Sequence, residues 1–238
     1  MVRHDCSEVV TKMSELQPER ERPFWHHTHR GEPRWPISLV VLTVIVLQLT
    51  LPENLNVSNS KLVCAVEGLL LIAVNVLNPA RISSHEIWPR RLNLVLLVVM
   101  SGANLVSIAN LINQLLHAGV KNPNELLLSG GSIWLTNVVV FGLWYWEFDR
   151  GGPGARAEAK YHVPDFMFPQ MSDPDLAEPH WAASFFDYLY MSFTNSSAFS
   201  PTDVLPLTRW AKALMLAQSL TSLVVVALVI ARAVNILH

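Results

Sequence analysis

The feature that most constrains this chain is its set of long apolar runs, which contain almost no charged residues. Five such runs cover residues 36–51, 62–77, 92–116, 126–146 and 208–237. A helix needs about 20 apolar residues to cross the roughly 30 Å of hydrocarbon in a bilayer. Because the charged residues concentrate in the first 34 positions and in the connectors, the sequence predicts an all-α integral membrane protein with five transmembrane helices.

The polar and apolar segments divide the chain into three parts. Residues 1–34 form a polar tail with too much proline and charge to build a core. Residues 35–125 contain the first three apolar runs and are predicted to form a three-helix membrane bundle. Residues 126–238 contain the last two runs and everything between them.

Composition also excludes several classes of site and partner. A net charge of −2 gives no basic field for nucleic acid. The cysteines are Cys6 and Cys64, so a cysteine-based metal site is not expected. The spacing of His26, His27 and His29 matches no standard metal site and favours an interfacial tail. Since no catalytic motif with a mechanism is found either, we expect no enzyme activity, no catalytic residue, no metal and no cofactor.

A short apolar segment and a polar stretch stand between the fourth and the last run. Residues 181–194 would form a helix of about 21 Å, which is too short to cross a bilayer. The polar stretch 195–205 follows, and this order is typical of a re-entrant pore loop. Non-helical backbone is tolerated at membrane depth only where protein or water surrounds it. We therefore expect several copies of the chain to enclose a shared cavity.

The connector at 148–180 is acidic and rich in proline and glycine. Its titratable residues include His162, Asp165, Asp173, Asp175, Glu178 and His180. These side chains could bind a divalent cation, but they lack the spacing of a calcium loop, which favours a solvated turret. The apolar hexapeptide Phe166–Met171 is unusual for a free linker, and we predict that it packs against the short helix or a neighbouring subunit.

Several polar residues interrupt the apolar runs. Glu67 lies inside the second run, where a charge facing lipid would be costly. The third run contains a polar ribbon at steps of three residues, formed by Ser101, Asn104, Ser107, Asn110 and Asn113. Glu67 and this ribbon could form a proton or cation relay, or the polar groups could form hydrogen bonds between helices. The second interpretation is favoured because a single acid without a partnering cation makes a poor relay.

An ordered set of residues opens the last apolar run, namely Asp203, Pro206, Thr208, Trp210 and Lys212. This segment resembles the pore module of the tetrameric potassium-channel superfamily. In that family a pore helix ends in threonine, and an aspartate closes a glycine-containing filter. A Pro-x-Thr-x-Trp-x-Arg/Lys segment then opens the inner helix.

The resemblance covers residues 181–237 together with the outer helix. It implies an outer helix at 126–147, an acidic connector at 148–180, a pore helix at 181–194, a filter-like loop at 195–205 and an inner helix at 206–237. It does not extend to the first three runs.

The loop departs from the family where selectivity is set. Ser200 and Thr202 stand in place of glycines, and Pro201 replaces the aromatic residue between them. These residues disfavour a ring of inward-facing carbonyls. The filter-like candidates are Thr194, Asn195, Ser196, Ser197, Ala198, Phe199, Ser200, Pro201, Thr202 and Asp203, and the candidates on the inner helix are Gln218, Thr221 and Ser222.

The resemblance implies an oligomeric cation channel with altered or weak selectivity. Its expected partners are the lipid bilayer, monovalent cations and further copies of the chain in a homotetramer. The main alternative is a non-conducting structural or regulatory membrane protein that keeps the pore-module fold. A transporter-like or enzymatic role has the least support.

The distribution of basic residues indicates an orientation. The tail contains six Lys and Arg residues, more than any connector between the first four runs, and the positive-inside rule places it in the cytoplasm. With five spans, the pore loop would then enter from the cytoplasmic side of the plasma (inner) membrane. This is the reverse of the potassium-channel arrangement, although glutamate receptor channels insert their pore loop from that side.

Overall fold

A computed structural model describes residues 24–77, 87–117, 122–173, 175, 177–198 and 203–237. The first 23 residues of the predicted tail lie outside the described residues. So do Phe199, Ser200, Pro201 and Thr202 of the predicted filter-like loop.

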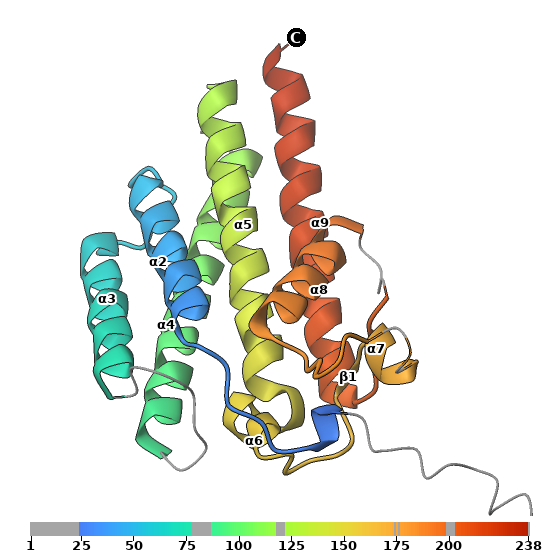
Figure 1. Ribbon diagram of the computed structural model, residues 1–238. Helices are drawn as coiled ribbons and strands as arrows, with labels where there is room; N and C mark the ends of the chain where they lie inside the picture. Colours follow the sequence, from blue (N-terminus) through green and yellow to red (C-terminus); the bar gives the residue numbers. More distant parts are fainter. Residues whose placement is uncertain are drawn as a thin grey trace, which may run out of the picture.

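Long helices dominate the structure, which confirms the all-α class. They are α2 (Trp35–Thr50), α3 (Ser60–Leu77), α4 (Ile87–Leu116), α5 (Pro123–Phe148) and α9 (Arg209–Leu237). Successive long helices run in alternating directions, so α5 ends and α9 begins at the same end of the bundle (Figure 1). The C-terminal end of α9 lies at the opposite end.

The number of helices able to cross a membrane is lower than the five predicted. Among the described residues, four helices are long and apolar enough, and they lie at 60–77, 88–116, 124–151 and 209–235. Helix α2 is apolar but has only 16 residues. Prolines limit it, because Pro36 occupies its first turn and Pro52 forces Leu51 into an extended conformation with ψ 139°.

Short elements gather at the end of the bundle where α9 begins (Figure 1). They are η1 (Phe24–His26), η2 (Asp149–Gly151), α6 (Pro153–Ala157), β1 (Phe166–Met167), α7 (Pro169–Ser172) and β2 (Leu205–Pro206). The two strands pair antiparallel, with Phe166 opposite Pro206 and Met167 opposite Leu205. The connector is therefore joined to the start of α9 by backbone hydrogen bonds.

Helix α8 (Phe185–Ala198) is the short helix expected before α9, and it begins and ends later than the predicted range 181–194. Its start is fixed by Asp187, whose Oδ2 accepts hydrogen bonds from Ser184 N and Oγ at 2.7 and 2.8 Å, the acid's half of a capping box. It begins near the end of α5 and extends along only part of the length of α5 and α9 (Figure 1). The next described element, β2, lies at the end where α8 began (Figure 1).

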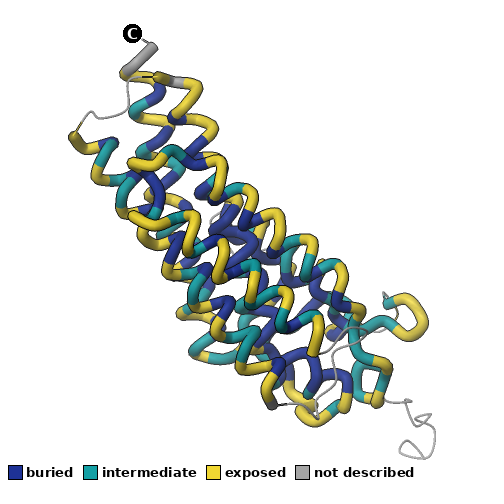
Figure 2. Tube along the Cα trace, turned by 90° about the vertical axis from the view of Figure 1, so that its left-hand side faces the viewer, coloured by how far each residue is buried: buried dark blue, intermediate teal, exposed yellow. Residues whose placement is uncertain are grey.

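Buried residues run along the centre of the bundle, and the exposed residues face outward (Figure 2). One apolar cluster joins α2, α3, α4, α5, α8, the connector and the first half of α9, and a second joins α4, α5, α9 and the segment that follows α2. Many large apolar side chains are exposed, including Leu69, Leu128 and Leu216. An outward apolar surface of this kind is what a bilayer would cover.

The apolar hexapeptide of the connector is packed, as the sequence predicts. Phe168 is buried and lies 5.2 Å from the ring of Tyr188 on α8. Phe166 is also buried, between the rings of Tyr145 at 5.1 Å and Trp210 at 5.6 Å. The hexapeptide therefore forms part of the core beneath α8.

Candidate functional site

A buried charged cluster fixes the connector below α8, and Asp149 is its centre. One oxygen of Asp149, Oδ1, accepts hydrogen bonds from the backbone N–H groups of Asp165 at 2.8 Å and Phe166 at 3.3 Å. The other, Oδ2, accepts from Tyr188 Oη at 2.6 Å and Arg150 Nε at 3.2 Å. The fully buried carboxylate thus joins the end of α5 to β1 and to α8.

Arg156 is the second charged group of this cluster and is also buried. Its Nη1 donates to the carbonyl oxygens of Trp146 at 2.6 Å and Asp149 at 3.1 Å, and its Nη2 to Glu32 Oε1 at 3.4 Å. Burial by itself would lower the pKa of Arg156, but Tyr188, Glu32 and Asp149 outweigh it and raise that pKa above its ordinary value. Arg156 is therefore a permanent cation that balances the surrounding acids.

Asp165 links the connector to the start of α9. Its Oδ1 accepts a hydrogen bond from Trp210 Nε1 at 3.0 Å, and its Oδ2 from the backbone N–H of Arg150 at 2.9 Å. Its carbonyl oxygen accepts from Leu207 N at 2.8 Å. Trp210, one of the residues that carry the channel resemblance, thus holds α9 against the connector.

The other titratable residues of the connector are dispersed. Asp173 accepts a hydrogen bond from the backbone of Asp175 at 3.2 Å, and His162 lies 5.2 Å from the ring of His26. Within the described part of the chain, no three His, Cys, Asp or Glu residues are grouped so that they could hold a metal ion.

A buried polar cluster holds the C-terminal half of α8 between α5 and α9, and Gln218 is its centre. Its Nε2 lies 2.6 Å from Ser192 Oγ, 2.7 Å from Ser196 Oγ and 3.0 Å from the Ser192 carbonyl oxygen. Its Oε1 accepts from Tyr145 Oη and from Asn195 Nδ2. Gln218 itself is 0% exposed.

The burial of this cluster corrects part of the predicted pore lining. Asn195, Ser196, Gln218 and Ser222 are buried within a single chain and have almost no surface to offer a shared water path. They instead join helices, since Asn195 Nδ2 also donates to the Met215 carbonyl at 3.1 Å. Sequence alone could not show this, because it does not fix which face of α8 and of α9 turns inward.

Other predicted lining residues keep accessible surface. Ser197, Ala198 and Asp203 are exposed, and Thr194 and Thr221 are partly buried. Ser197 Oγ and Thr221 Oγ1 donate only to carbonyls of their own helices, at 2.9 Å to Phe193 and 2.8 Å to Ala217. Because neither hydroxyl group bonds to another helix, both side chains can still contact water or a neighbouring subunit.

The polar ribbon of α4 forms hydrogen bonds between helices. Asn104 Nδ2 donates to Asn137 Oδ1 at 3.2 Å, and Asn137 Nδ2 to Ser222 Oγ at 3.2 Å, which links α4, α5 and α9. At the N-terminal end of the ribbon, Trp144 Nε1 donates to Ser101 Oγ at 2.8 Å. Farther along α4, Asn110 Nδ2 donates to the Asn56 carbonyl at 3.1 Å. These bonds match the favoured interpretation of the ribbon.

Glu67 lies apart from the ribbon, between α2 and α3. It is 0% exposed, and its Oε1 accepts from Gln48 Nε2 at 3.3 Å. Cys64 Sγ lies 3.6 Å from Gln48 Oε1 in the same contact. Glu67 therefore joins the first two helices through Gln48.

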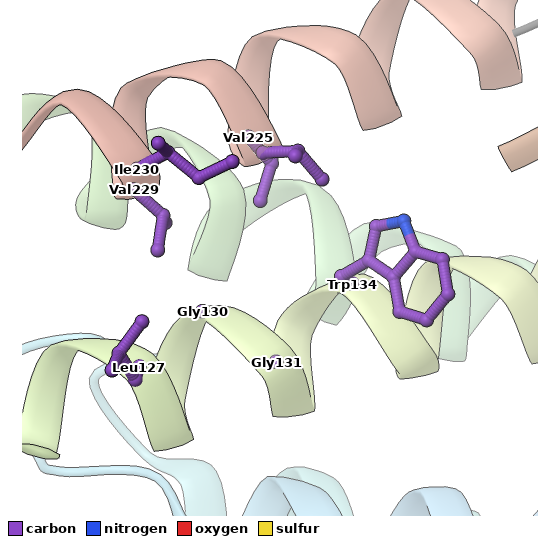
Figure 3. A pocket seen from close by; sticks show the side chains of 8 residues that line it. Leu127, Gly130, Gly131, Trp134, Val225, Val229 and Ile230 are labelled. Atoms are coloured by element: carbon purple, nitrogen blue, oxygen red, sulfur yellow. The ribbon is translucent and has the colours of Figure 1, made fainter. Parts of the chain in front are cut away.

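An apolar pocket of about 330 Å³ lies between α5 and α9 (Figure 3). Gly130, Gly131 and Trp134 line it on α5, and Val225, Val229 and Ile230 line it on α9. A Cβ atom at Gly130 would lie 2.8 Å from Val229 Cγ2, so glycine permits the close approach of the two helices. Because its walls are almost wholly apolar, this pocket is not a path for ions.

Several important residues lack a sequence signal of their own. Asp149 and Arg156 belong to a connector that the sequence predicts to be solvated. Ser192 lies before the predicted filter-like loop and was therefore not among the candidates. Asp149 alone has a positional signal, because a charged residue directly after a long apolar run either faces solvent or is buried with a partner. Only the folded chain shows that it is paired.

The described part of the chain is thus all-α, with four helices long and apolar enough to cross a membrane and a short helix α8 held between α5 and α9 by buried polar groups. No family model, no curated protein and no solved structure matches this chain.

Proposed function

We propose that this protein is a potassium-channel-like membrane protein, an oligomeric cation channel with altered or weak selectivity. The observation that carries the proposal is the arrangement of α8, which has 14 residues. A helix of that length extends about 21 Å and cannot cross a bilayer. It begins at the end where α5 stops, and β2 and the start of α9 lie at that same end (Figure 1). This arrangement supports our proposal of a re-entrant pore loop.

The outer face of α8 supports assembly from several copies. Phe186, Tyr190 and Phe193 are 73%, 52% and 46% exposed, and their spacing places them along one side of the helix. The described non-helical residues 203–208 before α9 require protein or water around them at membrane depth. A second copy of the chain packed on this face would meet that need. We infer a homotetramer by the resemblance to the channel superfamily.

Hydroxyl groups and a carboxylate are the chemistry available for a cation. Ser197, Thr194 and Asp203 keep accessible surface near the end of α8 and after it. Such groups suit a hydrated monovalent cation, because they can bind its water shell without replacing it. Weak selectivity follows, since selection by the ion's bare radius needs direct coordination.

The described N-terminal segment and the connector lie at one end of the bundle. His29 N donates to the Ala157 carbonyl at 2.9 Å, which ties the two together. The basic residues of the tail favour the cytoplasm for that end. We therefore propose that α8 enters the plasma (inner) membrane from the cytoplasmic side.

A second candidate function is that of a non-conducting structural or regulatory membrane protein. The burial of Asn195, Ser196 and Gln218 favours it, because these polar groups are fully used inside one chain. Such a protein would keep the pore-module fold as a packing unit. Access of water to the outer face of α8 distinguishes the two functions.

Substituted cysteines measure that access. In a background where Cys6 and Cys64 are replaced by alanine, Ser197→Cys is expected to react with a charged, water-soluble thiol reagent more than about tenfold faster than Ser196→Cys. The reason is that only a hydrated thiol ionises readily, and Ser196 is 0% exposed whereas Ser197 is exposed. Equal rates, or labelling of Ser197→Cys only by lipophilic reagents, would favour the non-conducting alternative.

A further inference from the structure

The first residue of α8 is held by an acid from the other end of the sequence. Glu32 Oε2 accepts a hydrogen bond from the backbone N–H of Phe185 at 2.8 Å, across 153 residues of chain. Both carboxylate oxygens also accept from Trp146 Nε1, at 3.1 and 3.2 Å. Arg156 Nη2 lies 3.4 Å from Oε1, and the Glu32 side chain is only 17% exposed. Glu32 thus contacts α8, α5 and the connector at once.

A carboxylate at this position has a clear physical effect on a helix. The first N–H groups of an α-helix lack partners within it, and the N-terminus carries a partial positive charge. Asp187 satisfies the N–H of Ser184 from inside α8. Glu32 satisfies the next N–H group, that of Phe185, from outside. The start of α8 is therefore capped twice, and only one of the caps belongs to the helix.

The segment that carries Glu32 is itself fastened to the connector. We call residues 24–34 the N-terminal clasp. Trp25 O accepts from Arg150 Nη1 at 3.5 Å, and the Arg150 guanidinium lies 5.5 Å from the centre of the Trp25 ring. Phe24 packs against His180, just before α8, with ring centres 4.9 Å apart. The clasp crosses the end of the bundle and leads directly into α2 (Figure 1).

We propose that Glu32 is a positioning residue for α8 and that the N-terminal clasp couples the first helices of the chain to the pore helix. The part concerning ion conduction rests on the proposed channel function, whereas the capping of α8 does not. By this coupling, a movement of α2 or of the tail would shift the start of α8 through Glu32. This coupling would give a role to the first helices of the chain, which the channel resemblance does not cover.

Hydrogen–deuterium exchange of the full-length protein in lipid nanodiscs tests the proposal without any ion flux. In Glu32→Ala, we expect the amides of residues 185–188 to exchange about five- to tenfold faster than in the unmodified protein, the effect of losing one helix cap. Glu32→Asp, which keeps a carboxylate on a shorter stem, should restore part of the protection. The amides of α9 should not change.

Glu178→Ala is the matched control, because Glu178 is an exposed acid that also precedes α8. It should leave exchange at 185–188 unchanged. The proposal is overturned if Glu32→Ala leaves these amides protected, or if exchange rises equally throughout α5, α8 and α9, which would indicate only global destabilisation. The absence of cation flux in the unmodified protein would remove the channel function, yet the exchange result would still decide the role of Glu32.

Discussion

Replacing Asp149 with alanine is expected to lower the free energy of unfolding by about 3–5 kcal/mol, the range measured when one member of a buried charge pair is removed. The carboxylate is 0% exposed and accepts four hydrogen bonds. Without it, Arg150 and Tyr188 would keep buried polar groups that have lost their acceptor, and the N–H of Asp165 would lose its bond. Equilibrium unfolding in mixed detergent micelles measures the change.

Asp175→Ala is the control for Asp149→Ala, because Asp175 is an exposed acid in the same connector. It should change the free energy of unfolding by less than about 0.5 kcal/mol. Tyr188→Phe, which removes one of the four donors to Asp149, should fall between the two variants. If Asp149→Ala were as stable as Asp175→Ala, the connector would be a solvated turret and not part of the core.

Replacing Gln218 with leucine is expected to lower the free energy of unfolding by about 2–4 kcal/mol. Each polar contact between membrane helices contributes on average about 0.6 kcal/mol and at most about 1.7 kcal/mol, and Gln218 makes five to Tyr145, Ser192, Asn195 and Ser196. Leucine has a similar size, so the loss would come from unsatisfied polar groups and not from a cavity. The same unfolding measurement applies.

Thr221→Val provides the comparison on the same helix. Thr221 donates only to the carbonyl of Ala217 within α9, so its hydroxyl joins no other helix. Its replacement should change stability by less than about 0.5 kcal/mol. A Gln218→Leu variant of unchanged stability would mean that α8 is held by apolar packing alone.

Local patterns in the sequence predicted the parts of the fold that depend on local physics. Long runs without charge gave the helices at 60–77, 88–116, 124–151 and 209–235. The short run before α9 predicted α8, although Ser184 and Asp187 shift its start to Phe185. The first run, 36–51, was correctly placed but wrongly counted as a transmembrane helix, because prolines at both ends hold α2 to 16 residues.

The sites that join distant segments could not be predicted in the same way. Glu32, Asp149 and Tyr188 are far apart in sequence and meet only in the folded chain, where Arg156 lies 4.9 Å from the Tyr188 ring. Gln218 is a polar residue in an apolar run, which fits a pore-lining position as well as a buried link between helices. The choice depends on the rotation of α9 against α8, and periodicity within one helix does not contain that information.

Cation flux through the purified protein in liposomes tests the channel proposal most directly. We expect potassium and sodium to pass at comparable rates, because the accessible groups at Ser197 and Asp203 suit hydrated ions. Asp203→Asn should reduce the flux several-fold by removing a carboxylate from each subunit, whereas Asp175→Asn should leave it unchanged. If neither cation passes at any pH or voltage while the protein stays folded, the channel function is contradicted and the non-conducting alternative stands.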